Sequence, residues 1–339
     1  MRVLLAGGAG YVGTHTAIAL LEAGHDVVLL DDLTNTSGIV SERIHQITGK
    51  RAPLVAGNAA HVDDVERAFD DFGPFDSIMH FAAKKAVGES VQQPLAYYRN
   101  NLDTTYTLVK VGLQRGISSF IFSSTGTVYS DPADLPFTEE ASRNLVELSN
   151  PYSKSKLMNE VVLTDVQRVH PELNVTLLRY FNPVGAHPSG LVGEDPKGIP
   201  NNLMPFVARV AVGALPAINV FGTDYDTPDG TGLRDYIHVV DLAEGHVAAL
   251  EKARPGLAAY NLGTGKPVSV LELISSFERA VGRELPKVMA PRRDGDLAAT
   301  YCDPSKAERE LGWKAERSID DMTRDVWNWQ QRNPSGYEA

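Results

Sequence analysis

The stretch RVLLAGGAGYVG at residues 2–13 begins with an apolar run and continues into a glycine-rich loop. The apolar run is short and bounded by glycine, which predicts a buried strand. Two glycine patterns fit the loop: G-x-G-x-x-G through Gly8, Gly10 and Gly13, and G-x-x-G-x-x-G that starts at Gly7 instead. Glycines let the backbone approach a pyrophosphate, and the N-terminus of a following helix offers N–H donors and a positive dipole end. The stretch therefore predicts a dinucleotide-binding turn between a strand and a helix.

Strands and helices alternate on the C-terminal side of this turn. Helical spacing occurs at 15–22 and 95–115, and short apolar runs predict strands at 25–30, 77–81 and 118–123. Such alternation is typical of parallel βαβ units, so we expect an α/β fold with a Rossmann-type doubly wound parallel sheet.

The pattern loosens in the second half of the chain. Glycine and proline cluster at 182–200 and 222–232, and long connections of this kind are often functional. They are followed by a strand at 260–262, a helix at 269–280 and a terminal helix from 319. We expect an NAD-binding Rossmann domain at 1–180 and a smaller C-terminal α/β substrate lobe at 181–339, with some chain crossing between them.

Composition narrows the possible partners and compartment. The 339 residues carry a formal charge of -11, which repels phosphate backbones and makes nucleic acid an unexpected partner. Cys302 is the one cysteine, so no disulfide can form within the chain, as is usual in a reducing cytoplasm. No apolar run approaches the roughly 18 residues of a membrane span. We expect a cytoplasmic protein that is not bound to membranes, and nothing predicts a metal site.

Two carboxylates follow the second predicted strand. Asp31 can accept hydrogen bonds from ribose hydroxyls and would repel a 2′-phosphate. Asp32 adds a second negative charge, and no arginine lies close in sequence. These residues favour NAD over NADP as the cofactor.

The run NPYSKSK at 150–156 offers a base for proton transfer. Asn150 and Pro151 are suited to a helix cap and to the first helical position, so Tyr152 lies in the first turn and Lys156 on the same face. A cation about 4 Å away could lower the pKa of a tyrosine from about 10 to about 7.

The same Y-x-x-x-K spacing recurs at Tyr106, deep in the helix predicted at 95–115. Ligands bind beyond the C-terminal ends of parallel strands, where the following helices begin. Tyr106 is about ten residues further along, roughly 15 Å from that edge. We therefore interpret Tyr106 as a packing residue and Tyr152 as the base.

Three hydroxyl side chains end the strand predicted at 118–123: Ser123, Ser124 and Thr125. They lie at the sheet edge where a substrate hydroxyl would bind. Thr125 could bridge that hydroxyl and Tyr152.

Long blocks of the chain resemble the extended short-chain dehydrogenase/reductase family and, within it, the UDP-glucose (UDP-galactose) 4-epimerases. The resemblance runs nearly end to end. Its blocks are GGAGYVG at Gly7, KAVGES at Lys85, PYSKSK at Pro151, LRYFNPVGAHPSG at Leu178, EDPKGIPNNLMP at Glu194, DGTGLRDYIHVVDLA at Asp229 and APRRDGDL at Ala290.

The resemblance implies an isomerase of galactose metabolism that interconverts UDP-glucose and UDP-galactose at C4 through a 4-keto intermediate. Tyr152 would take the proton from the 4-hydroxyl, and Lys156 would hold the nicotinamide ribose and lower the pKa of Tyr152. Thr125 would be the third catalytic residue. NAD would be regenerated in each turnover. A homodimer formed through helices of the NAD domain, including the helix at 95–115, is also implied.

Further site residues are implied by position. Expected NAD contacts are Gly7, Gly10, Tyr11, Val12, Gly13, Asp31, Asp32, Leu33, Thr34, Asn35, Thr36, Asn58, Ala59, Phe81, Ala82, Ala83, Lys85, Asn100, Tyr152, Lys156 and Phe181. Expected UDP-sugar contacts are Lys85, Thr125, Tyr152, Asn182, Asn202, Leu203, Phe221, Arg234, Arg293, Asp296 and Thr300. The two arginines are suited to clamping a pyrophosphate that the acidic chain otherwise repels.

Three positions depart from the family pattern. Thr125 stands where a serine is usual but keeps the hydroxyl. Asn58 replaces an aspartate near the adenine and can still accept a hydrogen bond, without charge. Thr300 stands where many glucose-specific relatives have tyrosine, so we hypothesise that UDP-N-acetylglucosamine is also epimerised.

Two alternative functions remain open. A nucleotide-sugar 4,6-dehydratase of the same family would share the NAD site, but it normally has an acidic pair after the hydroxyl residue, where this chain has Gly126 and Thr127. A non-catalytic NAD-sensing protein on the same fold would often lack the tyrosine or the lysine, and both are present here.

Overall fold

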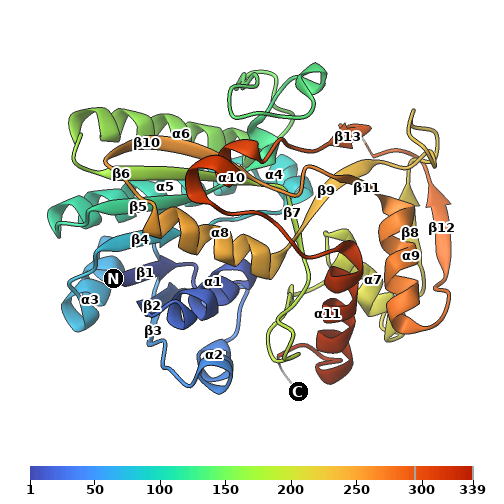
Figure 1. Ribbon diagram of the computed structural model, residues 1–339, viewed down its shortest axis with the longest axis horizontal. Helices are drawn as coiled ribbons and strands as arrows, with labels where there is room; N and C mark the ends of the chain where they lie inside the picture. Colours follow the sequence, from blue (N-terminus) through green and yellow to red (C-terminus); the bar gives the residue numbers. More distant parts are fainter. Residues whose placement is uncertain (294, 338–339) are drawn as a thin grey trace.

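The computed structural model describes residues 1–293 and 295–337. Its largest element is a seven-stranded sheet with the order β10–β6–β5–β4–β1–β2–β3 (Figure 1), in which every neighbouring pair is parallel. The strands are β1 (Arg2–Ala6), β2 (Asp26–Asp31), β3 (Leu54–Ala56), β4 (Ser77–His80), β5 (Ser119–Thr125), β6 (Asn174–Tyr180) and β10 (Gly256–Leu262). The predicted Rossmann-type doubly wound sheet is confirmed. The strand order reverses between β1 and β4, where such sheets bind their ligands.

Helices cover both faces of this sheet (Figure 1). One layer contains α1 (Tyr11–Glu22), α2 (Val40–Thr48) and α8 (Val239–Glu251). The other contains α3 (Val62–Phe72), α5 (Pro94–Gln114) and α6 (Pro151–Val169), with the short α4 (Val87–Gln92) against α5 and α6.

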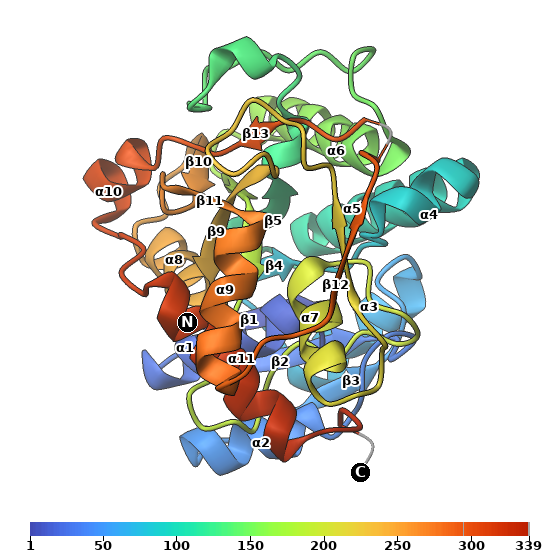
Figure 2. The ribbon, with the colours of Figure 1, turned by 90° about the vertical axis from the view of Figure 1, so that its right-hand side faces the viewer.

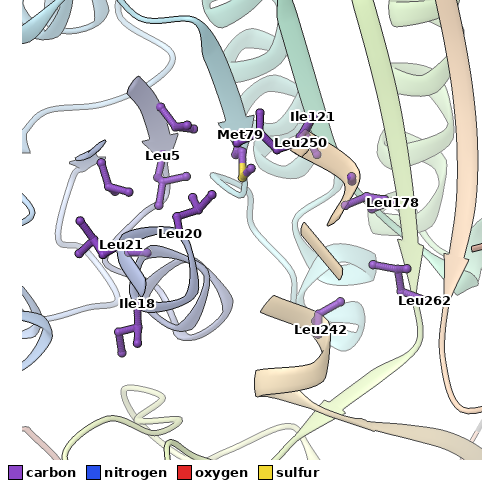
Figure 3. Packing of buried hydrophobic residues seen from close by; sticks show 14 of the residues in the cluster. Leu5, Ile18, Leu20, Leu21, Met79, Ile121, Leu178, Leu242, Leu250 and Leu262 are labelled. Atoms are coloured by element: carbon purple, nitrogen blue, oxygen red, sulfur yellow. The ribbon is translucent and has the colours of Figure 1, made fainter. Parts of the chain in front are cut away.

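The buried core consists of two apolar layers, one on each side of the sheet. Residues of β1 alternate between them: Val3 and Leu5 pack with α1 and α8, whereas Leu4 and Ala6 pack with α3 and α5. Figure 3 shows the first of these layers around Leu5. The alternation follows from the two-residue period of a strand. Each buried leucine or valine contributes about 1.5–3 kcal/mol, so β1 is fixed from both sides and holds the glycine loop at its end.

A second, smaller α/β part lies beside the sheet in Figure 1 and faces the viewer in Figure 2. Its strands are β7 (Asn182–Val184), β9 (Leu233–His238), β11 (Pro267–Ser269) and β13 (Ala299–Thr300) in one sheet, with β8 (Ile218–Phe221) and β12 (Lys287–Ala290) paired in another. Its helices are α7 (Leu203–Ala211), α9 (Val270–Val281) and α11 (Ile319–Arg332), while α10 (Ser305–Leu311) packs on β10 and α8. Capping boxes at Ser269 and Ser318 fix where α9 and α11 begin.

The strand predicted at 260–262 is longer than expected, from Gly256 to Leu262, and it joins the first sheet beside β6. The chain therefore leaves the first sheet after β6 and returns to it. The division into domains at residue 180 stays a prediction, and any such division has to include this crossing. Among the described residues, no helix has both the length and the apolar character needed to span a bilayer.

Candidate functional site

A cavity of about 1910 Å³ lies at the C-terminal edge of the seven-stranded sheet and continues between that sheet and the second part. This volume is about twice the upper end of the usual range for a small-molecule site. The cavity is therefore large enough for a dinucleotide and a second ligand together.

The glycine loop forms one wall of the cavity. Gly7 has φ +76°, and a Cβ added there would lie 2.5 Å from the backbone nitrogen of Ala82. A Cβ on Gly13 would lie 2.5 Å from the carbonyl oxygen of Gly7. Gly8 does not line the cavity, because it packs against Leu5 and Leu29. The pattern that faces the cavity is thus the one that begins at Gly7.

The first turn of α1 also faces the cavity. Gly10 caps this helix without a side-chain hydrogen bond, and the first turn contains no acidic residue. Residues 10–13 all line the cavity. Gly10 N donates to Gly7 O at 3.2 Å, but the N–H groups of residues 11–13 have no partner within the helix. Together with the helix dipole they favour a phosphate at this point.

Asp31 and Asp32 line the cavity at the end of β2. The carboxylate of Asp31 already accepts hydrogen bonds from Ala9 N (3.1 Å), Leu33 N (3.0 Å) and the Thr36 hydroxyl (3.0 Å). Burial raises the pKa of Asp31, while these hydrogen bonds lower it. Asp31 therefore also shapes the loop. Asp32 likewise accepts from Thr34 N at 3.0 Å, from the Thr34 hydroxyl at 2.7 Å and from the Asn58 amide at 3.4 Å, but it is exposed at the cavity wall.

Asn58 lies beside these carboxylates. Its amide nitrogen is 3.4 Å from Asp32, and its side-chain oxygen accepts a hydrogen bond from Ala60 N at 2.8 Å. That oxygen keeps one further lone pair for a ligand.

Helix α6 presents Tyr152 and Lys156 to the cavity one turn apart. The helix begins as predicted, since Asn150 accepts a hydrogen bond from Ser153 N at 2.9 Å and Pro151 is the first helical residue. Burial raises the pKa of Tyr152 to about 12, and a hydrogen bond with the Thr125 hydroxyl opposes this shift. Burial of the phenol, which the sequence argument left out, opposes the lowering of the pKa expected from a nearby cation.

Lys156 is directed toward the sheet. Its ammonium donates to Ser123 O at 2.6 Å and lies 4.7 Å from the centroid of the Phe122 ring. Burial lowers the pKa of Lys156 to about 7, although the charge of Glu160 opposes this. Lys156 is thus held against the end of β5 by the backbone.

The three hydroxyl residues that end β5 have different partners. The Ser123 hydroxyl bonds to that of Tyr180, and the Ser124 hydroxyl donates to Glu160 at 2.5 Å. The Thr125 hydroxyl lies 3.1 Å from that of Thr127, and it is close enough to Tyr152 to lower the pKa of that residue. Thr125 is therefore the one of these three that meets the expected base.

A buried ion pair between Glu160 and Arg179 lies next to these hydroxyl residues. Glu160, one turn after Lys156, accepts from two nitrogens of Arg179 at 2.9 and 2.7 Å. Both side chains are almost fully buried, at 3 % and 1 % exposed. The pair joins α6 to β6 and fixes the helix that carries Tyr152.

The interpretation of Tyr106 as a packing residue is wrong. Tyr106 is 47 % exposed on the outer face of α5, because α5 packs through its other residues. Tyr106 does not line the cavity, so the choice of Tyr152 over Tyr106 agrees with the placement of both residues.

Two arginines line the far part of the cavity. Arg293 donates to Asp296 at 2.8 Å and lies 5.2 Å from the centroid of the Phe221 ring. Arg234 is 3.6 Å from the same aspartate. Asp296 therefore holds two cations side by side, an arrangement suited to a pyrophosphate.

Leu33 is the one expected site residue that does not line the cavity; its side chain is directed toward Gly38. The others all line it: Gly7, Gly10, Tyr11, Val12, Gly13, Asp31, Asp32, Thr34, Asn35, Thr36, Asn58, Ala59, Phe81, Ala82, Ala83, Lys85, Asn100, Thr125, Tyr152, Lys156, Phe181, Asn182, Asn202, Leu203, Phe221, Arg234, Arg293, Asp296 and Thr300. Asp294 of the APRRDGDL block lies outside the described residues.

Several lining residues were missed by the sequence argument: Tyr180, Glu194, Lys197, Arg209 and Tyr337. Glu194 pairs with Lys85 at 3.2 Å and accepts from Asn202 at 3.1 Å. Tyr180, Glu194 and Lys197 stand in the blocks at Leu178 and Glu194, but their place in the cavity wall depends on the tertiary structure.

Comparisons with known proteins agree with this geometry. A sequence model of the NAD dependent epimerase/dehydratase family matches residues 3–263. UDP-glucose 4-epimerase from Bacillus subtilis is 50 % identical over 341 residues, covering 100 % of this chain and 99 % of its own. The crystal structure of UDP-glucose 4-epimerase from Bifidobacterium longum in complex with NAD+ and UDP is 52 % identical with a TM-score of 0.96, covering 99 % of this chain and 100 % of its own. The UDP-Glc/GlcNAc 4-epimerase from Campylobacter jejuni is 33 % identical with a TM-score of 0.83, covering 98 % and 99 %.

Proposed function

Because the chain belongs to the NAD dependent epimerase/dehydratase family, we propose that it is an NAD-dependent epimerase that interconverts UDP-glucose and UDP-galactose at C4. The observation that carries the proposal is that Tyr152, Lys156 and Thr125 line the same cavity as the Gly7 turn. A proton acceptor, Tyr152, therefore lies in the same cavity as the expected dinucleotide.

The residues present fit NAD. Gly7 and Gly13 have no Cβ to fill the turn, so its backbone stays accessible to a pyrophosphate. The first turn of α1 would hold the phosphates, and Asp31 and Asp32 at the end of β2 would accept from the adenosine ribose. Lys156 would hold the second ribose at the end of β5.

NAD, when bound, supplies the chemistry of accepting a hydride from C4 and returning it to the opposite face of the 4-keto sugar. The chain supplies the proton transfer. Tyr152 would take the proton of the 4-hydroxyl on its phenolate oxygen and return it at the end of the turnover. Thr125 would orient that hydroxyl and lower the pKa of Tyr152. Arg234 and Arg293 would hold the pyrophosphate of the UDP-sugar.

The direct test is to mix the purified protein with UDP-galactose, without added NAD, and to identify the product sugar. UDP-glucose as the product supports the proposal. A 4-keto, 6-deoxy product would instead assign a dehydratase, and no conversion even with added NAD would favour a non-catalytic NAD-binding protein. Gly126 and Thr127, which follow Thr125, supply no acid for dehydration.

We expect Thr125→Val to lower turnover at neutral pH by roughly tenfold or more, the equivalent of one hydrogen bond. The Thr125 hydroxyl lowers the pKa of Tyr152, so its loss raises that pKa further. A base acts in its deprotonated form, so the rising limb of the pH–rate profile should move to higher pH. Thr125→Ser keeps the hydroxyl and should leave the limb in place. An unmoved limb in Thr125→Val would remove Thr125 from the proton transfer.

We also propose that the enzyme epimerises UDP-N-acetylglucosamine. Thr300 lies beside Arg234 in the β13–β9 pairing and lines the cavity, and its small side chain leaves room for an acetamido group. We expect Thr300→Tyr to lower acetamido-sugar turnover at least about tenfold, an effect of steric exclusion, with a smaller change for UDP-galactose. Parallel assays of both sugars decide this: no acetamido turnover in the wild type, or no loss of it in Thr300→Tyr, would contradict the proposal.

A homodimer is proposed from the outer faces of α5 and α6. Leu95 at the start of α5 is 82 % exposed. Val161 of the neighbouring α6 is also exposed. Light scattering of the purified protein measures its mass in solution, and the mass of two chains would support the homodimer.

We propose a cytoplasmic location on the basis of Cys302, the one cysteine, which is buried as a free thiol.

A further inference from the structure

Residues 193–197, here called the closing loop, follow β7 and line the same cavity as the Gly7 turn. One end of the closing loop is attached to the loop after β2. The ammonium of Lys197 donates to Thr34 O at 2.9 Å and to Leu33 O at 3.3 Å, and Lys197 N donates to Asn35 at 3.3 Å. These bonds join segments more than 160 residues apart in the chain. The closing loop thus bridges to the wall that contains Asp32.

The other end of the closing loop is held by the C-terminal segment, which lies beside it (Figure 1). The Tyr337 hydroxyl donates to Gly193 O at 3.1 Å and accepts from Gly193 N at 3.2 Å. Tyr337 N donates to Asp195 at 2.9 Å. One tyrosine therefore satisfies both backbone groups of Gly193.

The C-terminal segment is itself anchored. The Tyr337 and Trp329 rings pack with centroids 4.7 Å apart. The amide of Asn333 donates to Gly190 O at 3.0 Å and to Trp329 O at 2.9 Å. Since Trp329 is buried in α11, Tyr337 is attached to a rigid element rather than to a free chain end.

We propose that Tyr337 and Lys197 are positioning residues that fasten the closing loop over the dinucleotide part of the cavity and so slow the release of NAD. The inference rests on the proposed function, because it takes NAD as the occupant. Release needs an opening between the closing loop and the loop after β2, and the bonds of Lys197 and Tyr337 oppose that opening from its two ends. An enzyme that regenerates NAD in each turnover gains from slow release.

The test measures the rate at which NAD leaves. The wild type and the variants are loaded with a fluorescent ethenoadenine analogue of NAD, and release is followed after addition of excess NAD. Tyr337→Phe keeps the ring against Trp329 and removes both bonds to Gly193; we expect release to be roughly tenfold faster. Lys197→Met should have a similar effect at the other end. Lys197→Arg keeps a donor for Thr34 O and should restore slow release.

Tyr106→Phe and Lys110→Met are matched controls outside the cavity and should release the analogue at the wild-type rate. If the wild type binds the analogue and both Tyr337→Phe and Lys197→Met release it at the wild-type rate, the inference is wrong while the proposed function stands. If Tyr337→Phe does not fold, Lys197→Met decides alone. If the wild type holds no NAD, the proposed function fails, and this inference fails with it.

Discussion

Replacing Tyr152 with phenylalanine is expected to lower the turnover of UDP-galactose by about a hundredfold to ten-thousandfold, the range for loss of a positioned acid–base group. The change removes one oxygen from a partly buried ring and leaves the first turn of α6 intact. The Thr125 hydroxyl keeps its contact with Thr127, 3.1 Å away. The loss should therefore appear in turnover, with NAD still bound and the melting temperature nearly unchanged.

Tyr106→Phe is the matched control for this experiment. It removes the same oxygen from the same Y-x-x-x-K spacing, but on an exposed face of α5 outside the cavity. We expect its turnover to equal that of the wild type. Undiminished product formation by Tyr152→Phe would remove Tyr152 from the mechanism.

Glu160→Gln is expected to destabilise the protein by about 3–5 kcal/mol, the usual result when one partner of a buried ion pair is removed. The amide keeps the shape of Glu160 but leaves the charge of Arg179 buried without a carboxylate. Burial acts to lower the pKa of Arg179, and the hydrogen bond and charge of Glu160 raise it above its usual value, which identifies Glu160 as the compensating group. The free energy of unfolding in urea measures the loss.

Exposed Glu172 provides the control, because its carboxylate is largely in water 3.3 Å from His170. Glu172→Gln should change the free energy of unfolding by less than about 0.5 kcal/mol. If the buried charge causes the loss at Glu160, Glu160→Gln combined with Arg179→Met should cost less than the two single changes added together. A loss below about 1 kcal/mol in Glu160→Gln would contradict this account.

Turnover should fall in Glu160→Gln as well. Tyr152, Lys156 and Glu160 follow one another at four-residue spacing on one face of α6, and Glu160 also accepts from Ser124, the residue before Thr125. The ion pair thus fixes both the helix and the strand end that bring the base and the hydroxyl together.

The features that the sequence predicted well are local. Gly7 has φ +76°, and an added Cβ would lie 2.5 Å from a neighbouring backbone atom, so this position of the pattern requires glycine. Helical spacing alone brings Tyr152 and Lys156 to one face of α6. The helix start at Asn150 and Pro151 is local as well. The resemblance then supplied further expected residues, all of which line the cavity except Leu33.

The sequence by itself determined the strand–turn–helix that faces the cavity and the register of α6, because both depend on residues within about two turns of one another. The tertiary structure decided the pKa of Tyr152, which depends on burial, and the exposure of Tyr106, which depends on the side of α5 that packs. It also decided the contacts of Lys197 and Tyr337, whose partners lie more than 140 residues away. Burial and long-range contact follow from the order of strands in the sheet, and spacing along the chain does not encode that order.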